Sequence, residues 1–315
     1  MKLIKMMVAL SCVLYLGSCI KEDMSDCPRE NVFLTFVYTG NTTGANADYT
    51  WFGRMIDRVS LYVYNADTGD YLPDVTQQLD KAALTATDPA GTKLLLPEGR
   101  YTIVCWGNAF DDTQIVPAVS IDGGTVSHPS YGTLAELPTQ DHNYYGVTTV
   151  TVPQSGEVSG EVRFRGAHIN MEVVVKGFTG EQNTAEYPRI EIANAMPQYV
   201  MSSMATAAGY TQTYVPQVGW SATEGGNLST FQLFHFKDKN QLQLTVTNQA
   251  QDRIFYTVGL ENAMTTGGIT VEDAGGNVMN EVSVRIVLDF TNYWNDLSVK
   301  ITVEGWSSEN PVPEL

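Results

Sequence analysis

The chain has 315 residues, of which 43% are hydrophobic and 17% charged, and 18 basic against 35 acidic residues give a formal charge of −17. This length accommodates two domains of about 150 residues, each with its own core. The acidic balance argues against nucleic acid as a partner, because phosphate binding needs a basic face, and the ordinary apolar content argues against disorder.

A secretory signal is predicted over residues 1–18. Two lysines precede an apolar stretch over 6–16, and about eleven residues at 1.5 Å each are too short to cross roughly 30 Å of hydrocarbon. The stretch ends in Leu16-Gly17-Ser18-Cys19, which resembles a bacterial lipobox. We therefore predict cleavage between Ser18 and Cys19 and a lipoprotein that carries several acyl chains, such as palmitate, on Cys19. An ordinary cleaved signal with a chance cysteine is the alternative.

Residues 19–27 form the predicted lipidated tether. Its Lys21-Glu22-Asp23 segment resembles the export signal that sends some lipoproteins to the outer face of the outer membrane, and a generic acidic tether is the alternative. Without the signal, 16 basic and 35 acidic residues leave a charge of −19 (16 − 35). Anionic headgroups would repel such a chain, so the polypeptide should stand off the membrane. We predict a lipid-anchored protein of the outer membrane that faces the cell exterior.

Two cysteines remain after processing, because Cys12 leaves with the signal and Cys19 carries lipid. In an oxidising compartment, Cys27 and Cys105 are a possible disulfide pair. A buried free thiol at Cys105 is the alternative. No CxxC pair occurs and the four histidines are scattered along the sequence, so we predict no metal site and no cofactor.

Alternation of apolar and polar residues predicts strands along most of the mature chain. It places one face of each strand on a core and one in water, as in antiparallel sandwiches, and Gly-rich turns separate the strands. The best helix candidate, 74–87, is short. The sequence therefore predicts an all-β protein. In chain order the clearest strands lie at 32–37, 59–64, 100–106, 147–152, 158–164, 241–247, 282–289 and 297–304.

The polar break at Pro153-Gln154-Ser155-Gly156 provides the predicted domain boundary. It separates an N-terminal β-sandwich domain over 28–155 from a C-terminal β-sandwich domain over 156–306. A short tail over 307–315 follows.

No motif for catalysis stands out. The turn Asn65-x-Asp67-x-Gly69-Asp70 is faintly similar to a calcium loop, but Thr76 stands where an EF-hand needs a bidentate Glu, so a hairpin turn is the favoured interpretation. There is no HExxH motif, GxSxG elbow or phosphate loop. We predict that the protein is not an enzyme and that its histidines are surface or strand residues. They are His128, His142, His168 and His235.

Nine aromatic residues form another candidate group. Their flat rings suit a sugar platform, which would make the protein a surface glycan-binding lipoprotein of a polysaccharide-uptake system. The favoured alternative is that they fill sandwich cores, as β-propensity alone would produce. They are Trp51, Tyr62, Tyr64, Trp106, Tyr144, Tyr145, Trp220, Tyr293 and Trp294.

Several segments, in this order after the lipobox, resemble a known family. They are Asp26-Cys27-Pro28, the strand 56–64 with its Asp-x-Gly turn, the segment 96–108, Tyr144-Tyr145-Gly146 and the ending 299–306. Together they resemble the fimbrillin-A-associated anchor lipoproteins, which sit at the base of type V pili in Gram-negative bacteria. The resemblance implies two tandem transthyretin-like Greek-key β-sandwich domains after the signal peptide.

The resemblance also implies a function in cell adhesion. The protein would anchor a type V pilus, or fimbria, to the outer membrane and limit its length, with stalk or other fimbrial subunits as partners. Subunits of this class are thought to join by strand exchange, in which a segment of one chain completes the sandwich of another.

Two consequences follow from that role. An anchor must keep its lipidated start, so we expect that neither Arg54 nor Arg58, each a cleavage site in principle, is used. The tail contains Pro311 and Pro313, which cannot donate to a ladder. We therefore expect the partner to bind a groove or a sheet edge elsewhere.

Overall fold

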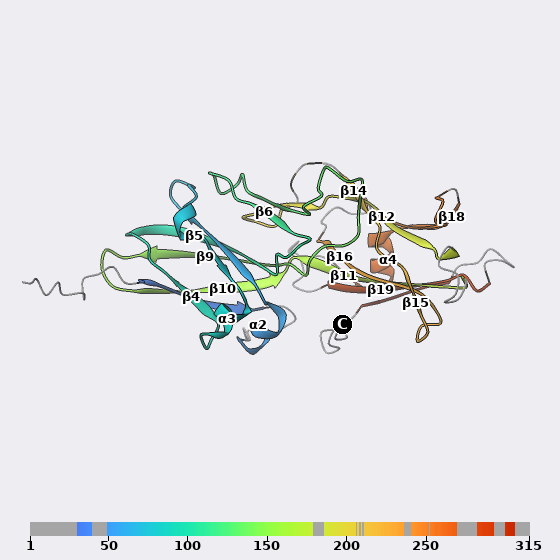
Figure 1. Ribbon diagram of the computed structural model, residues 1–315, viewed down its shortest axis with the longest axis horizontal. Coiled ribbons are helices and arrows are strands. Elements are labelled where there is room, and N and C mark those ends of the chain that lie inside the picture. The colour runs from blue at the N-terminus through green and yellow to red at the C-terminus, as the bar shows by residue number, and fades with distance from the viewer. Residues whose placement is uncertain are drawn as a thin grey trace, which may run out of the picture.

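The computed structural model describes residues 30–39, 49–178, 186–235 apart from 206, 208 and 210, 241–269 apart from 252, 282–292 and 300–305. Strands predominate in these ranges and the helices are short, which confirms the all-β prediction. Two groups of sheets follow one another along the long axis (Figure 1). The signal, the tether and the tail lie outside the described residues. Within the described ranges, no helix is long and apolar enough to cross a bilayer.

The first sheet consists of β1 (Val32–Tyr38), β2 (Val59–Asn65), β3 (Gln77–Leu79), β4 (Gly91–Leu94), β5 (Gly99–Gly107), β9 (Tyr144–Val152) and β10 (Val158–Gly166). Its order is β3-β2-β5-β9-β10-β1-β4, and the pairing of β1 with β10 is parallel. Strands from both ends of the sheet contribute to one apolar core. Phe52 of α2 (Tyr49–Met55) and Leu84 of α3 (Lys81–Thr85) complete this N-terminal core.

Two five-stranded sheets enclose the second core, and this C-terminal half is a sandwich as predicted. One sheet contains β15 (Gly219–Ser221), β16 (Gly226–Phe234), β11 (His168–Lys176), β19 (Val282–Asp289) and β20 (Lys300–Gly305), in that order. The other contains β18 (Ile254–Gly259), β17 (Gln243–Thr247), β12 (Arg189–Ala195), β14 (Gln212–Tyr214) and β8 (Glu136–Leu137). Inward residues of both sheets share the C-terminal core with α4 (Leu260–Thr266).

A third, small sheet packs on the outer face of the first sheet. It has the strands β13 (Gln198–Val200), β7 (Thr125–Ser127) and β6 (Gln114–Val116). Alternation along β2 predicts one wet face, yet both faces are buried. Leu61 lies in the N-terminal core, whereas Tyr62 and Tyr64 pack with residues of β7 and β13. The second face of β2 is buried by β7 and β13, which lie far from β2 in the sequence. Local periodicity cannot reveal such a contact.

The passage between the two cores differs from the prediction. β10 pairs with β1 and β9, so it belongs to the first sheet although it follows the predicted boundary at 155/156. The polar break is the reversal between β9 and β10, where Gly156 has a φ of 97°. The chain changes sheets at Ala167, the single residue between β10 and β11. Residues 158–176 therefore form one nearly continuous strand that serves both sheets (Figure 1).

The helix predicted over 74–87 is wrong for most of its length. A 3₁₀ turn, η2 (Pro73–Val75), leads into β3, and only Lys81–Thr85 is helical. Residues 77–79 instead form β3, which pairs with β2. This tertiary pairing decides their structure, because their local pattern fits a helix and a strand equally well. Asp80 begins α3 because its side chain accepts a hydrogen bond from the Ala83 N–H at 2.9 Å.

Candidate functional site at the first strand and the domain junction

The first strand after the tether is built into the N-terminal sheet. β1 pairs with β10 along all seven of its residues and with β4 on its other side. Val32, Leu34 and Phe36 lie in the core with exposed fractions of 0%, 3% and 0%. The ring of Phe36 meets that of Phe164 edge to face, with 5.6 Å between centroids. The start of the described chain is therefore an integral strand of the core.

Two local features fix the position of β1. The Asn31 side chain accepts from the Leu96 N–H at 3.0 Å and donates to the Leu96 carbonyl at 2.8 Å, which holds the strand at its beginning. β4 then approaches so closely that a Cβ on Gly91 would lie 2.1 Å from the carbonyl oxygen of Leu34. Only glycine fits at this position, because the obstructing atom is backbone.

Arg58 is held at the head of β2. Its guanidinium donates to the Ala109 carbonyl at 3.1 Å and lies 4.7 Å from the centroid of the Phe110 ring. Its own carbonyl accepts from the Asn108 N–H at 2.9 Å. A protease would have to undo these contacts to reach the peptide bond, which supports the expectation that Arg58 is not cleaved. Arg54 is exposed on α2, with its guanidinium 5.2 Å from the Trp51 ring centroid.

An apolar cluster joins the two halves of the molecule, and Trp106 of β5 lies in it. Trp106 is fully buried, its Nε1 donates to the Met201 carbonyl at 3.0 Å, and its ring stacks on Tyr199 with 6.0 Å between centroids. The Tyr199 hydroxyl shares its hydrogen bond between the carbonyl oxygens of Ala167 and His235, at 3.1 and 3.0 Å. These contacts connect β5, the small sheet and the crossing point between β10 and β11.

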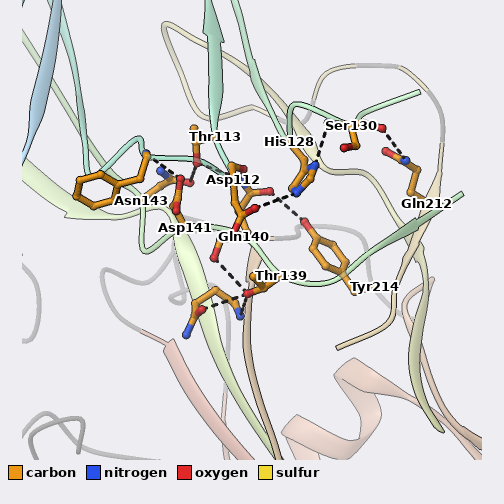
Figure 2. Close-up of polar contacts among 12 residues, drawn as sticks. Asp112, Thr113, His128, Ser130, Thr139, Gln140, Asp141, Asn143, Gln212 and Tyr214 are labelled. Atoms are coloured by element: carbon orange, nitrogen blue, oxygen red, sulfur yellow. Dashed lines mark hydrogen bonds and ion pairs between the residues drawn. The ribbon is translucent and has the colours of Figure 1, made fainter. Parts of the chain in front are cut away.

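Polar side chains form a second cluster at the same junction, shown in Figure 2. Gln140 donates to the Thr113 hydroxyl at 3.0 Å and receives a long hydrogen bond, 3.4 Å, from the Tyr214 hydroxyl of β14. Thr113 donates to the Asn143 side chain at 3.0 Å. Asp141 accepts from the Phe110 N–H at 2.8 Å, and burial raises the pKa of its carboxyl group. The cluster ties the segments before β6 and β9 to the C-terminal sandwich.

Asp112, His128 and Ser130 are residue types of a hydrolytic triad, but their geometry is different. His128 Nδ1 accepts from the Ser130 backbone N–H at 3.0 Å, and Nε2 lies 3.4 Å from an Asp112 carboxylate oxygen. These contacts direct neither ring nitrogen at the serine hydroxyl, so the three residues do not have the arrangement of a triad. Burial lowers the pKa of His128, against the opposing effect of Asp112. This group is a structural contact of the loop after β7.

The remaining predicted residues occupy structural positions. Asn65 Oδ1 accepts from the N–H groups of Asp67 and Thr68 at 2.9 and 3.0 Å, which confirms a hairpin turn in place of a calcium loop. Cys105 is buried in the N-terminal core, and burial raises the pKa of its thiol. Cys27 lies outside the described residues, so its pairing stays a prediction. Within the described ranges, no three His, Cys, Asp or Glu side chains are grouped to hold a metal ion.

Most of the predicted aromatic group fills the interior, which confirms the favoured interpretation for those residues. The five buried members are Tyr62, Tyr64, Trp106, Tyr144 and Tyr145. Trp51 is 39% exposed and Trp220 is half-buried. Tyr293 and Trp294 lie outside the described residues. No flat platform of several aromatic rings is formed by the members that the structure describes.

Comparison with known proteins identifies a family whose model matches most of the chain. The model of the family described as fimbrillin-A associated anchor proteins Mfa1 and Mfa2 matches residues 24–310. No curated protein matches the chain.

Three solved structures illustrate the shared fold. The fimbrial anchor protein Mfa2 from Porphyromonas gingivalis is 17% identical with a TM-score of 0.63, and the match covers 88% of this chain and 97% of that one. A candidate polysaccharide-binding protein from Bacteroides thetaiotaomicron is 15% identical with a TM-score of 0.68, covering 90% and 100%. A candidate adhesin from Bacteroides ovatus is 16% identical with a TM-score of 0.67, covering 92% and 98%. At these identities the likeness establishes the fold.

Proposed function

Because this chain belongs to the fimbrillin-A associated anchor protein family, we propose that it is an outer-membrane lipoprotein that holds a fimbria on the cell surface and limits its length. Lipid on Cys19 would provide the attachment, and a stalk or other fimbrial subunit would be the partner. The observation that carries the proposal is the placement of β1. This strand begins 13 residues after Cys19 (32 − 19) and is hydrogen-bonded between β10 and β4.

The burial of β1 supports an anchor over a subunit that releases its first strand. Removal of β1 would take Val32, Leu34 and Phe36 out of the N-terminal core and expose the facing side of Phe164. Each large apolar side chain lost from a core costs about 2–5 kcal/mol. A chain that must stay connected to its lipid gains from a first strand that cannot leave.

We place the contact with the partner at the C-terminal sandwich. Strand exchange needs an outer strand of useful length, and β3 and β4 of the first sheet have only three and four residues. Among the strands that the structure describes, β18 and β20 are outermost in their sheets and have six residues each. Figure 1 shows β18 at the end of the molecule away from the first sheet. A partner there would stand clear of the membrane.

Deletion of the gene, followed by electron microscopy of whole cells and of the medium, tests the proposal. We expect fibres that are detached or longer than those of the parent strain, because nothing would hold or terminate them at the surface. Expression of the intact gene from a plasmid is the control and should restore attached fibres of normal length. Attached fibres of unchanged length on the deletion strain would contradict the proposal.

A glycan-binding function is the second candidate, favoured by the exposed Trp51 ring and by the description of one structural relative as a candidate polysaccharide-binding protein. If the anchor proposal is correct, the purified mature protein should pass unretarded through columns of immobilised polysaccharide, and Trp51→Ala should behave like the parent. Retention of the parent that is lost in Trp51→Ala but kept in Trp220→Ala would favour the glycan function.

A further inference from the structure

All four histidines of the chain gather around the junction between the two halves. His128 follows β7 and His142 precedes β9, whereas His168 is the first residue of β11 and His235 directly follows β16. His168 also contacts Tyr144, a member of the N-terminal core, with 5.4 Å between ring centroids. A change in histidine charge would therefore act first on the junction.

The two innermost histidines are held in the neutral form. His168 is fully buried, and its Nδ1 donates to the Asn143 carbonyl at 2.8 Å, while its Nε2 has no hydrogen-bond partner among the described residues. His235 is 4% exposed, and neither of its ring nitrogens has a partner in that part of the chain. A protonated imidazole carries two N–H donors and a charge. The residues that the structure describes around the two rings do not supply the acceptors or the counter-charge that this form needs.

The groups that face these rings also oppose protonation. His142 lies against His168 with 5.0 Å between ring centroids, and the edge of Tyr144 lies 5.4 Å away on another side. His235 and His142 both disfavour a charge on His168, and the Arg165 cation disfavours one on His235. Burial is the largest effect and lowers the pKa of each from about 6.5 to about 3. Burial lowers the pKa of His128 as well, but there the carboxylates of Asp112 and Asp141 oppose the shift.

We propose that the junction is an acid-sensitive coupling, in which protonation of His168 and His235 releases the two halves from one another while each core stays folded. The attachments that would be released converge on Ala167. The backbone N–H of Ala167 donates to the Asn143 carbonyl at 2.8 Å. Its carbonyl accepts from the Tyr199 hydroxyl and from the backbone N–H of His235. The proposal does not depend on the fimbrial partner.

The direction of the effect follows from proton linkage. The closed junction keeps both histidines neutral, so the open form binds more protons, and the closed form loses stability as the pH falls below about 6.5. A shift from about 6.5 to about 3 for each residue changes the open-to-closed ratio by roughly 25-fold between pH 7 and pH 5, or about 600-fold for both. The closed form is therefore fully stable at neutral pH and weakens between pH 6.5 and 3.

Hydrogen–deuterium exchange of the full mature lipoprotein in detergent tests the proposal, after correction for the intrinsic pH dependence of amide exchange. Peptides that contain Ala167 and His168 should lose protection by about two to three orders of magnitude between pH 7 and pH 5. Peptides from β17, in the C-terminal core, should change much less. Equal losses in β17, or a change below about 5-fold at Ala167, would overturn the proposal.

A pair of variants assigns the effect to the two residues. In the His168→Asn, His235→Leu double variant, the Asn amide replaces the Nδ1 donor and neither residue titrates. The pH dependence at Ala167 should therefore fall to the smaller remainder that comes from His142 and His128, whose pKa values burial also lowers. His128→Asn is the matched control and should keep most of the wild-type pH dependence. Wild-type pH dependence in a folded double variant would refute the assignment. If the double variant does not fold, the comparison of Ala167 with β17 in the wild type still decides the proposal.

Discussion

Replacing Cys19 by alanine is expected to move the protein from the outer membrane to the soluble fraction, and its fibres from the cell surface to the medium. Each methylene of an acyl chain that is buried in the bilayer contributes about 0.8 kcal/mol. A mature chain with a charge of −19 (16 − 35) has no compensating attraction to anionic headgroups. Cell fractionation with immunoblotting, together with electron microscopy of cells and medium, measures both effects.

Cys105→Ala is the matched control for this experiment. It removes the buried thiol of the N-terminal core and leaves Cys19 unchanged. We expect this variant to stay in the membrane fraction and to carry attached fibres, with at most a modest loss of stability. A Cys19→Ala protein that remains in the membrane fraction would show that something other than lipid holds it there.

Trp106→Ala is expected to produce the largest loss of stability among single changes at the junction. The substitution leaves a cavity between Tyr145 and Tyr199 and removes the hydrogen bond to the Met201 carbonyl. Truncation of a buried Trp to Ala costs about 3–5 kcal/mol. Urea unfolding at pH 7.5, followed by circular dichroism, should show this loss, and we expect the two halves to unfold in separate transitions.

Trp106→Phe is a milder change at the same position. The Phe ring keeps much of the stacking with Tyr199 but loses the donor to the Met201 carbonyl and part of the indole volume, so its cost should be about 1–3 kcal/mol. Trp51→Ala, at an exposed position on α2, should change the free energy of unfolding by less than about 1 kcal/mol. A Trp106→Ala protein as stable as the parent would mean that the cluster does not join the two halves.

The strand content was predictable because alternation is a local property. The ranges 59–64 and 282–289 appear as β2 and β19 within a residue at each end, since each strand must place every second side chain on a core. The boundary predicted at 155/156 differs from the point where the chain changes sheets, because the local signal used for it is not specific. A polar break with glycine marks a chain reversal equally well within a domain and between domains, and only the pairing of β10 with β1 distinguishes them.

The junction was not predictable from local pattern. His142 and His168 belong to segments whose proximity depends on the sheet order, and nothing in their spacing predicts that their rings meet. Trp106 shows the same limit, since its alternating strand gives no sign that the outer face is covered by Tyr199 from the other half of the chain. The family was recognisable because it rests on the order of segments along the chain, which is preserved whatever contacts they make.

The parallel pairing of β1 with β10 has a mechanical consequence. If the protein is the proposed anchor, tension from a fibre at the C-terminal sandwich, opposed by lipid on Cys19, would pull β1 and β10 in opposite directions along their axes. Because the two strands run parallel over seven residues, their hydrogen bonds would be loaded in shear and would have to rupture together instead of unzipping one by one. Because β10 continues through Ala167 into β11, the same backbone carries that load across the molecule.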